Sequence, residues 1–553
     1  MDVVLARTPA PASRAGALAL AVPEGERTPR GIAAEVDRRA RGAVAALLGS
    51  RDFAGHAFET AVLYPRGLAT GRLVLVGLGK RAEIDARGLR LAAAQAARRA
   101  RELRAGSLTF ALPDIDRGDD AARLAHVCAE GLVLGYYRHD AYRSERTPPL
   151  RRIEIAAGAA ALRDRAERAR LAAAVATGAR WAEGTCVARD LASTPGQDLT
   201  PEGLGRRARE IARATGASCQ VLGVPELERL GMGALLAVGR GSIHPPRFIV
   251  LERAAGGAGR RRAADGRTVV VIGKGVTFDT GGISLKPAEN MGKMKYDMSG
   301  AAAVLGLFAA LGGPGAGALP FRVVGLIPTA ENMPGGAALK PGDVVRALDG
   351  TTIEVVNTDA EGRLILADAL GYAARLKPEA VVDLATLTGA ISIALGHHAA
   401  GLFTRDDGLA AGLLEAGAAS GERLWRLPLW DDYAAALRSD TADLANSGGR
   451  EGGAILGAKF LEHFARGLTW AHLDIASTAW TPVDRPHEPR GPTGVGVRLL
   501  LEWVTRRAGA PAASAAGPAS SAAASRPAGR ARRAARTRPA RAAAGRRAAR
   551  PRR

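Results

Sequence analysis

The sequence has few cysteines, few aromatic residues and no long apolar run. Its three cysteines, Cys128, Cys186 and Cys219, lie far apart among 553 residues and form no CxxC pair. This spacing excludes a disulfide framework and a cysteine-based zinc site. The N-terminus lacks a signal-peptide pattern, and no apolar stretch approaches the length of a membrane span. We therefore expect a soluble cytoplasmic protein that has no membrane partner.

Lysine is also scarce, although the chain carries a net charge of +22. Only eight of its 77 basic residues are lysine, and twelve of the arginines lie in residues 508–553, which contain no acid and 20 alanines. Because this tail has no large apolar side chain to bury, we expect it to be disordered. Two interpretations of the tail remain open. It binds nucleic-acid phosphates non-specifically, or it is an incidental extension of an arginine-rich chain.

The first part of the chain alternates short apolar runs with helical patterns. Strands are predicted at residues 73–78 and 108–112, and helices at residues 89–103 and 121–134. This alternation predicts an N-terminal α/β domain over residues 1–158. A long helical stretch at residues 159–191 ends at Ser193-Thr-Pro-Gly, which predicts a linking helix over residues 159–195.

The second part, residues 196–507, has the same alternation on a larger scale. Helices are predicted at residues 300–311 and 364–376. Strands are predicted at residues 248–251, 268–272, 321–326, 353–356, 380–384 and 471–475. Such a pattern indicates a mostly parallel or mixed sheet with helices on both faces. Ligands of such sheets bind at the carboxyl ends of the strands.

Half of the lysines fall within 22 positions of this second part: Lys274, Lys286, Lys293 and Lys295. In a chain that uses arginine for general positive charge, lysine suggests a task that a guanidinium cannot perform, such as losing its proton or acting as a compact point charge. The same region is rich in acids near predicted strand ends.

Three junctions between elements carry these acids: Asp279 in a glycine-rich loop, Asp297 before a helix, and Asp359 with Glu361 after a strand. Divalent cations prefer clustered carboxylates, and a pair of metals needs carboxylates that bridge. The alternative is structural, because an Asp before a helix is commonly an N-cap and a Glu in the first turn complements the helix dipole. Spacing alone leaves both interpretations open.

Two basic residues would complete a metal site. A neutral amine of Lys274 would serve as a nitrogen ligand, since a dication can displace its proton. Arg363, beside Glu361, would offer a fork to an anion.

Five segments resemble the leucyl (cytosol) aminopeptidase family in order and spacing: residues 273–287, 294–300, 331–336, 357–364 and 383–389. The octapeptide NTDAEGRL at residues 357–364 is similar to the signature of that family. The resemblance covers residues 165–505 well, is looser over the first 155 residues and is absent from the tail. It implies a smaller N-terminal α/β domain and a C-terminal α/β dimetal peptidase domain with a mixed central sheet flanked by helices, assembled as a homohexamer.

The resemblance also implies roles for individual residues. Lys286 and Arg363 would be catalytic, and Arg363 would hold bicarbonate as the general base. Two divalent ions, Mn²⁺ or Zn²⁺, would be bound, one by Lys274, Asp279, Asp297 and Glu361 and the other by Asp279, Asp359 and Glu361. The substrate pocket would be formed by Met294, Thr386, Gly389 and Ala476.

The implied activity is removal of N-terminal amino acids, preferentially Leu-like, from peptides with a free N-terminus. Water activated by the two metals would attack the peptide bond. An apolar pocket of Met, Ala and Gly fits a Leu-like side chain.

Overall fold

The structure is a computed structural model that describes residues 1–114, 120–256, 267–313 and 316–509. The tail for which the sequence predicts disorder lies outside these residues from position 510 onward. None of the helices within the described residues is both long enough and apolar enough to cross a membrane.

The N-terminal part contains a six-stranded sheet of order β1-β6-β5-β2-β4-β3, parallel except for the β3–β4 pair. Its strands are β1 (Asp2–Leu5), β2 (Ala17–Val22), β3 (Thr60–Leu63), β4 (Leu73–Gly77), β5 (Ser107–Ala111) and β6 (Arg152–Ala156). Its helices are α1 (Gly31–Arg39), α2 (Ala43–Ser50), α3 (Ala86–Glu102) and α4 (Ala121–Tyr136). The two strands and two helices predicted here are confirmed, with ends that differ by a few residues.

Strand β2 shows why both faces of this sheet are covered. Its sequence, ALALAV, is buried throughout. Ala17 and Ala19 pack in one apolar core with residues of α3 and α4. Leu18 and Leu20, on the other face, pack with residues of α1 and α2. A strand with cores on both faces is apolar continuously rather than in alternation.

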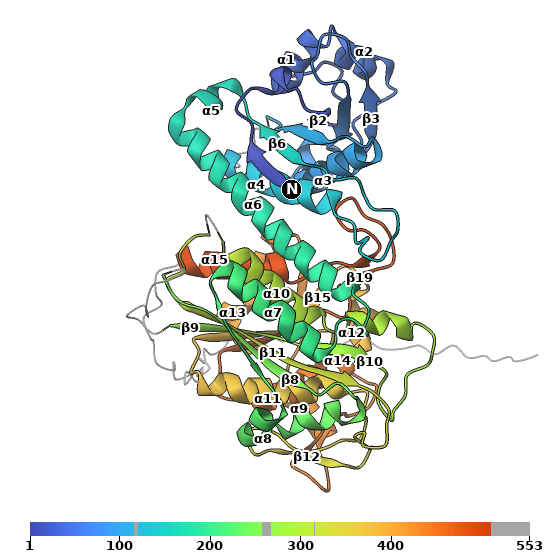
Figure 1. Cartoon of the computed structure of the whole chain (residues 1–553), viewed down its shortest axis with the longest axis vertical. Helices are drawn as coiled ribbons and strands as arrows, with labels where there is room; N and C mark the ends of the chain where they lie inside the picture. Colours follow the sequence, from blue (N-terminus) through green and yellow to red (C-terminus); the bar gives the residue numbers. More distant parts are fainter. Residues whose placement is uncertain (115–119, 257–266, 314–315, 510–553) are drawn as a thin grey trace, which may run out of the picture. The chain divides into compact units, whose positions relative to one another are not determined.

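The predicted linking helix is interrupted once. Helix α5 (Ala159–Arg163) is followed by α6 (Arg165–Ser193), which packs against α4 and α10 (Ser299–Leu311) (Figure 1). Asp164 separates the two helices because it is extended, and its side chain accepts hydrogen bonds from the amides of Ala166 at 2.8 Å and Glu167 at 3.2 Å. An Asp in this position satisfies the free amides at the start of a helix.

The C-terminal part contains a mixed nine-stranded sheet in which eight strands follow the order β16-β15-β18-β14-β9-β11-β8-β7, and β10 pairs with β11. The strands are β7 (Ser218–Leu222), β8 (Arg247–Arg253), β9 (Thr268–Gly273), β10 (Gly275–Asp279), β11 (Arg322–Asn332), β14 (Ala380–Ala385), β15 (Ala400–Phe403), β16 (Leu424–Arg426) and β18 (Trp470–Asp474). Helices cover both faces: α7 (Pro201–Thr215), α8 (Val224–Leu230), α9 (Gly233–Val238), α10, α11 (Glu361–Arg375), α12 (Gly389–Leu395), α13 (Asp407–Ser420), α14 (Gly453–Phe464) and α15 (Val497–Gly509).

Two features of this part differ from the sequence-based expectation. The sequence places Asp279 in a glycine-rich loop, but residues 275–279 form β10, which pairs with the last residues of a β11 longer than predicted. The predicted strand at residues 353–356 is β13 (Thr352–Glu354), which belongs to a separate small sheet with β12 (Val344–Arg346) and β17 (Leu444–Ala445). Both differences arise from pairing between segments far apart in the sequence, which local patterns do not encode.

The parallel strands of the large sheet end at one edge. Strands β11, β9, β14 and β18 are parallel neighbours, and their last residues are Asn332, Gly273, Ala385 and Asp474. The carboxyl ends of parallel strands are where an open α/β sheet binds its ligands. We refer to this edge as the ligand edge.

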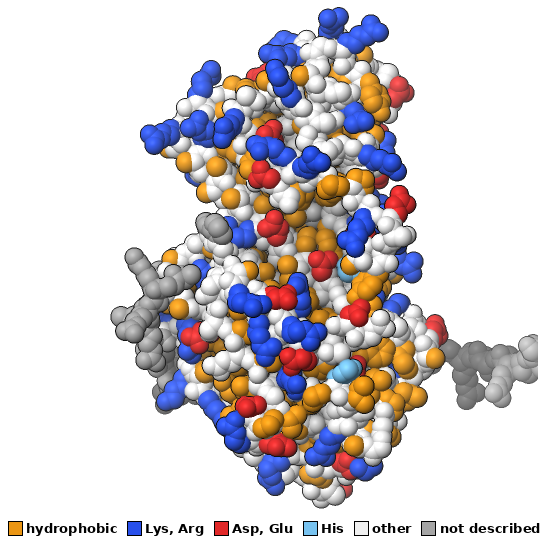
Figure 2. Space-filling view, viewed as in Figure 1, with side chains coloured by type: hydrophobic (Ala, Val, Ile, Leu, Met, Phe, Trp, Pro, Cys, Tyr) orange, Lys and Arg blue, Asp and Glu red, His pale blue; other side chains and the backbone are white. Residues whose placement is uncertain are grey.

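Basic side chains do not form one continuous stripe on the face shown in Figure 2. Lys and Arg side chains lie over both parts of the protein and are interspersed with Asp and Glu.

Candidate metal centre

The predicted ligand residues are all placed at the ligand edge by the ends of elements. Lys274 directly follows β9, Asp279 ends β10, and Glu361 begins α11. Asp297 follows the short 3-10 helix η4 (Met291–Tyr296), and Asp359 lies in the loop before α11. The N-cap positions of α10 and α11 are Met298 and Ala360. The interpretation of Asp297 and Asp359 as N-caps is therefore wrong.

Three carboxylates form a buried cluster. Asp279, Asp297 and Glu361 each offer an oxygen within 4.8 Å of the others, and their exposed fractions are 3 %, 6 % and 1 %. Lys274 lies among them, with its Nζ 2.9 Å from Asp297 Oδ2 and 2.8 Å from Glu361 Oε1. The ammonium also donates a hydrogen bond to the carbonyl oxygen of Thr386 at 2.8 Å.

A more open half of the site adjoins this cluster. Lys286 Nζ lies 2.8 Å from Asp279 Oδ2 and also forms an ion pair with Asp359. The side chains of Lys286 and Asp359 are 21 % and 34 % exposed. Asp279 therefore belongs to both halves, since it faces Lys286 while it lies in the buried cluster.

The electrostatics of the site are those of a cation-binding site that two ammonium groups only partly neutralise. Burial raises the pKa values of Asp297, Glu361 and Asp359 above their ordinary range. For Lys274 and Lys286, burial acts to lower the pKa, but the surrounding carboxylates outweigh it and raise the pKa above the ordinary lysine value. Four carboxylates face two lysines here, so additional positive charge would be stabilised.

The donor set fits divalent cations. Glu361 Oε2 is buried and has no hydrogen-bond partner within the described residues, and Asp297 Oδ2 has the ammonium of Lys274 beside it but no hydrogen bond. Buried carboxylate oxygens normally have partners. Oxygens from carboxylates and one amine nitrogen are donors that Mn²⁺ or Zn²⁺ accepts.

Two further residues, Asn332 and Thr386, hold the carboxylates in place. The sequence did not predict this role for either of them. Asn332 Nδ2 donates to Asp279 Oδ1 at 2.8 Å and to the carbonyl of Thr358 at 3.1 Å. Thr386, predicted for the substrate pocket, donates through Oγ1 to Asp297 Oδ1 at 2.6 Å. Asn332 lies in one of the family-like segments, but nothing in its local sequence indicates this contact.

Arg363 is buried behind Glu361 on α11, with a 7 % exposed fraction. Its Nη1 donates to the carbonyl of Asn446 at 2.7 Å, and its Nε has no hydrogen-bond partner among the residues that the structure describes. Burial lowers its pKa to about 10, against the opposing effect of Glu361 and Asp474. The guanidinium is thus still charged at neutral pH, and its buried Nε–H has no hydrogen-bond partner among the described residues.

The segments of the predicted substrate pocket meet at the same edge. The carboxylate of Asp474 accepts hydrogen bonds from the amides of Leu387 at 3.1 Å and Ala476 at 3.2 Å and from Thr388 Oγ1 at 2.7 Å. Asp474 thereby joins the loop that carries Thr386 and Gly389 to Ala476. Met294 lies in η4, and the adjoining Tyr296 ring is 5.5 Å from that of Trp480.

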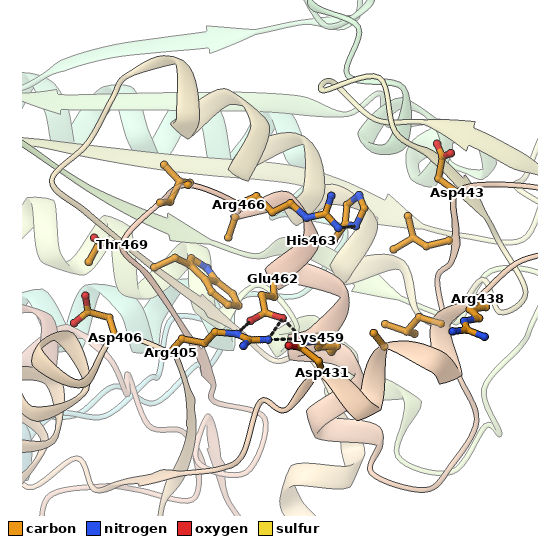
Figure 3. Close-up of a pocket in the computed structure, with 17 residues that line it drawn as sticks. Arg405, Asp406, Asp431, Arg438, Asp443, Lys459, Glu462, His463, Arg466 and Thr469 are labelled. Carbon is orange, nitrogen blue, oxygen red and sulfur yellow. Dashed lines mark hydrogen bonds and ion pairs between the residues drawn. The ribbon is translucent and has the colours of Figure 1, made fainter. Parts of the chain in front are cut away.

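A separate cavity of about 810 Å³ lies elsewhere in the C-terminal part (Figure 3). In Figure 3 the guanidinium of Arg405 points towards Glu462 and Asp431, which also pair with Lys459. The cavity lies at the amino end of β18, because Trp470 lines it and begins that strand. None of the predicted site residues lines it, so it is distinct from the carboxylate cluster.

Comparison with known protein families identifies the family of this chain. The profile of the cytosol aminopeptidase family, catalytic domain, matches residues 186–501, and that of the N-terminal domain of the same family matches residues 20–146. The chain belongs to the cytosol aminopeptidase family. The carboxylate cluster lies within the catalytic-domain match.

Individual members of the cytosol aminopeptidase family are similar over most of the chain. A probable cytosol aminopeptidase of Roseiflexus castenholzii is 49% identical over 453 residues, which cover 82% of this chain and 90% of the relative. One from Syntrophotalea carbinolica is 44% identical over 507 residues, covering 91% and 99%.

Solved structures agree with this assignment. The bottromycin maturation enzyme BotP in complex with Mn is 40% identical with a TM-score of 0.77, covering 89% of this chain and all of BotP. A mutant of tomato leucine aminopeptidase is 34% identical with a TM-score of 0.79, covering 92% and 96%. The chain is accordingly a metal-dependent aminopeptidase, a hydrolase built from the two α/β domains of its family.

Proposed function

We propose that this aminopeptidase uses two divalent ions to release N-terminal residues, preferentially Leu-like, from peptides. The observation that carries the proposal is the buried cluster of Asp279, Asp297 and Glu361 around Lys274 at the ligand edge. A cluster of this kind would supply carboxylates that bind both metal ions and carboxylates that bind only one.

The two halves of the site correspond to two metal positions. The buried half, with Lys274, Asp279, Asp297 and Glu361, would hold the tightly bound ion. The more open half, with Asp279, Asp359 and Glu361 and the backbone carbonyl of Asp359, would hold an exchangeable one. When bound, two Mn²⁺ or Zn²⁺ ions would acidify a water molecule and polarise the scissile carbonyl.

Lys286 and Arg363 would act on the reacting groups. Lys286, partly exposed and paired with Asp279 and Asp359, would place its positive charge at the developing oxyanion. Arg363, with its free Nε, would hold bicarbonate through its planar guanidinium, so that the anion serves as the general base.

The specificity follows from the neighbouring segments. A free α-amine would lie beside Asp297, which explains a requirement for an unblocked N-terminus. Met294, Thr386, Gly389 and Ala476 would surround the first side chain. Asp474 accepts hydrogen bonds from Ala476 and from Leu387 and Thr388, which lie between Thr386 and Gly389 in the chain. Such a pocket would be largely apolar and would favour Leu-like residues.

The experiment is a comparison of amide substrates with protein loaded with Mn²⁺ or Zn²⁺. Leucine amide should be cleaved at least about tenfold faster than aspartic acid amide, because the pocket offers no partner for a charged side chain. N-acetyl-leucine amide should remain intact. Equal rates on the blocked and free substrates, or no preference for leucine, would contradict the proposed specificity.

Four further predictions accompany this proposal, of which the oligomeric state rests on the family resemblance. We propose a homohexamer, which light scattering of the purified protein tests directly. The names of the relatives support the expected cytoplasmic location. The domain limits 1–158, 159–195 and 196–507 remain predictions, as does nucleic-acid binding by the tail, because residues 510–553 lie outside the described structure.

A further inference from the structure

Asn446 lies next to the metal site but belongs to neither the predicted ligands nor the predicted catalytic residues. It directly follows β17 and is completely buried. Strand β17 pairs with β13, and the loop that carries Asp359 begins just after β13. Asn446 is therefore placed alongside the start of this loop.

The side chain of Asn446 forms four hydrogen bonds with the backbone of the loop. Its Oδ1 accepts from the amides of Val356 at 2.9 Å and Asn357 at 3.2 Å. Its Nδ2 donates to the carbonyls of Asn357 at 2.7 Å and Ala360 at 3.4 Å. These are all the hydrogen bonds that an asparagine side chain can make. They span the loop from Val356 to Ala360, the residue before Glu361.

The main chain of Asn446 makes two further contacts with the same region. Its amide donates to the carbonyl of Glu354 at 2.9 Å, and its carbonyl accepts from Arg363 Nη1 at 2.7 Å. One residue thus holds the end of β13, the loop containing Asp359, and the guanidinium that we assign to anion binding.

We propose that Asn446 is a positioning residue of the metal centre, which sets the places of Asp359, Glu361 and Arg363 through the backbone of residues 356–360. The roles of those three residues rest on the proposed function. Only a side chain with both donors and acceptors can hold amides and carbonyls of one loop together. An aspartate of the same shape would place an oxygen against the carbonyls of Asn357 and Ala360.

The test uses the full chain with three substitutions. Asn446→Asp keeps the shape and removes the donors, and Asn446→Ala removes all four side-chain bonds. Thr404→Val is the control, because Thr404 is buried and its Oγ1 bonds the carbonyl of Trp470, at the amino end of β18 and away from the ligand edge. Metal-free proteins are titrated with Mn²⁺ by calorimetry, their melting temperatures are measured, and kcat and KM are determined with leucine amide.

Both Asn446 variants should bind Mn²⁺ about 10- to 100-fold more weakly than wild type, the range found when residues that support metal ligands are replaced. Their kcat should fall while KM changes less than about threefold. The substitution should displace the loop that carries Asp359 and precedes Glu361 but leave the substrate pocket unchanged. Thr404→Val should keep wild-type affinity for Mn²⁺, whatever its melting temperature. If Asn446→Ala does not fold, Asn446→Asp decides the result.

The inference would be overturned if a folded Asn446→Asp bound Mn²⁺ with wild-type affinity. It would also be overturned if Thr404→Val lost as much Mn²⁺ affinity as the Asn446 variants. The Mn²⁺ titration does not depend on hydrolysis. If wild type binds Mn²⁺ but cleaves no substrate, the proposed function fails, while the titration still tests the role of Asn446.

Discussion

Lys274 shows how one side chain can determine the state of the whole site. Its ammonium contacts Asp297, Glu361 and the carbonyl of Thr386, all within 3.0 Å. Helix α11 approaches this side chain closely, because a Cβ at Gly362 would lie 2.7 Å from Lys274 Nζ. In the metal-free protein this ammonium partly neutralises Asp297 and Glu361.

Replacing Lys274 by Met should therefore destabilise the metal-free protein. The substitution keeps the length of the side chain but leaves Asp297 and Glu361 buried without their partner, which costs about 3 to 5 kcal/mol when one member of a buried pair is removed. Urea unfolding of chelator-treated protein at about pH 9, above the raised pKa values of about 6 for Asp297 and about 8 for Glu361, should show a lower midpoint.

The control for this substitution is Lys340→Met. Lys340 pairs with Asp343 at 3.1 Å, but its side chain is 68% exposed, so its loss should change stability by less than about 0.5 kcal/mol. Equal midpoints for Lys274→Met and wild type would show that the buried ammonium does not stabilise the site.

Acidification should weaken metal binding. Burial raises the pKa of Asp297 to about 6 and, together with the charge of Asp279, that of Glu361 to about 8. Metal ions bind the deprotonated carboxylates, so below each raised pKa a proton must leave before the ion binds. Deprotonation of Lys274 as a ligand acts in the same direction. Mn²⁺ affinity should fall about tenfold per pH unit for each proton released.

Calorimetric titration with Mn²⁺ between about pH 8 and about pH 6 measures this dependence, a range set by the two raised carboxyl pKa values. The number of protons released is obtained by repeating the titration in buffers of different ionisation enthalpy. An affinity that is constant over this range would mean that Mn²⁺ binding releases no proton, either from the carboxylates or from Lys274, and would contradict this prediction.

Most of the residues at the site were predictable because their local sequence is distinctive. The acids and lysines near residues 274–297 and 357–363 stand out in an arginine-rich chain. Asn332 and Asn446 were not predictable in this way, since their contacts are with groups that only folding brings near: the carboxylate of Asp279 for Asn332 and backbone amides and carbonyls for Asn446.

At the scale of elements, the ligand edge depends on how closely α10 approaches the sheet. The amide of Lys274 donates to the carbonyl of Leu384, at 3.0 Å, and the amide of Ala301 donates to the carbonyl of Lys274, at 2.9 Å. These bonds join β9, β14 and the start of α10. Gly300 permits the approach, because a Cβ there would lie 2.8 Å from the amide nitrogen of Lys274 and closer still to the carbonyl of Leu384.

Gly300→Ala should push α10 away from the sheet and displace Lys274. The expected cost is about 1 to 3 kcal/mol, as for other overpacking substitutions, with weaker Mn²⁺ binding. Gly292→Ala, in η4, is the matched control, since a Cβ there meets no described atom within 4 Å. The melting temperature and the Mn²⁺ affinity should decrease in Gly300→Ala and stay unchanged in Gly292→Ala. If Gly300→Ala matches wild type in both, α10 does not lie as close to the sheet as this account requires.

The central elements of both sheets were predicted from sequence because they are buried on two faces. In β9, Val269 and Val271 pack in one core while Val270 and Ile272 pack in another, which produces a continuous apolar run. Strand β10 was missed because its five residues include a Gly, a Thr and an Asp and depend on pairing with the end of β11. The predicted α/β class was correct, whereas membership of β13 in a separate sheet was not encoded locally.

At the scale of the whole molecule, two arginines join the two α/β parts, Arg90, which is buried, and Arg123, which is partly exposed. Arg90 of α3 pairs with Glu130 of α4 at 2.5 Å, both nearly inaccessible, and also donates to the carbonyl of Ala419 at 3.3 Å. Arg123 of α4 donates to the same carbonyl at 3.0 Å and pairs with Glu502 of α15 at 2.5 Å. Arginine is suited to such sites because its planar guanidinium binds several acceptors at once.

Arginine and lysine have different roles in this chain. Arginine supplies the contacts between the two parts and the net charge of the tail, while the two lysines of the ligand edge are surrounded by acids. The net charge of +22 therefore says little about the activity, which depends on a small region of opposite character.

The most direct test of the account is the metal dependence of leucine amide hydrolysis by wild type and by Glu361→Gln. We predict that chelator-treated wild type is inactive, that Mn²⁺ restores hydrolysis, and that Glu361→Gln remains folded but loses at least about 100-fold in rate, because a carboxylate placed in both metal positions is lost. A Glu361→Gln protein with the full wild-type rate, or a wild type that cleaves no leucine amide with Mn²⁺ or Zn²⁺ bound, would contradict it.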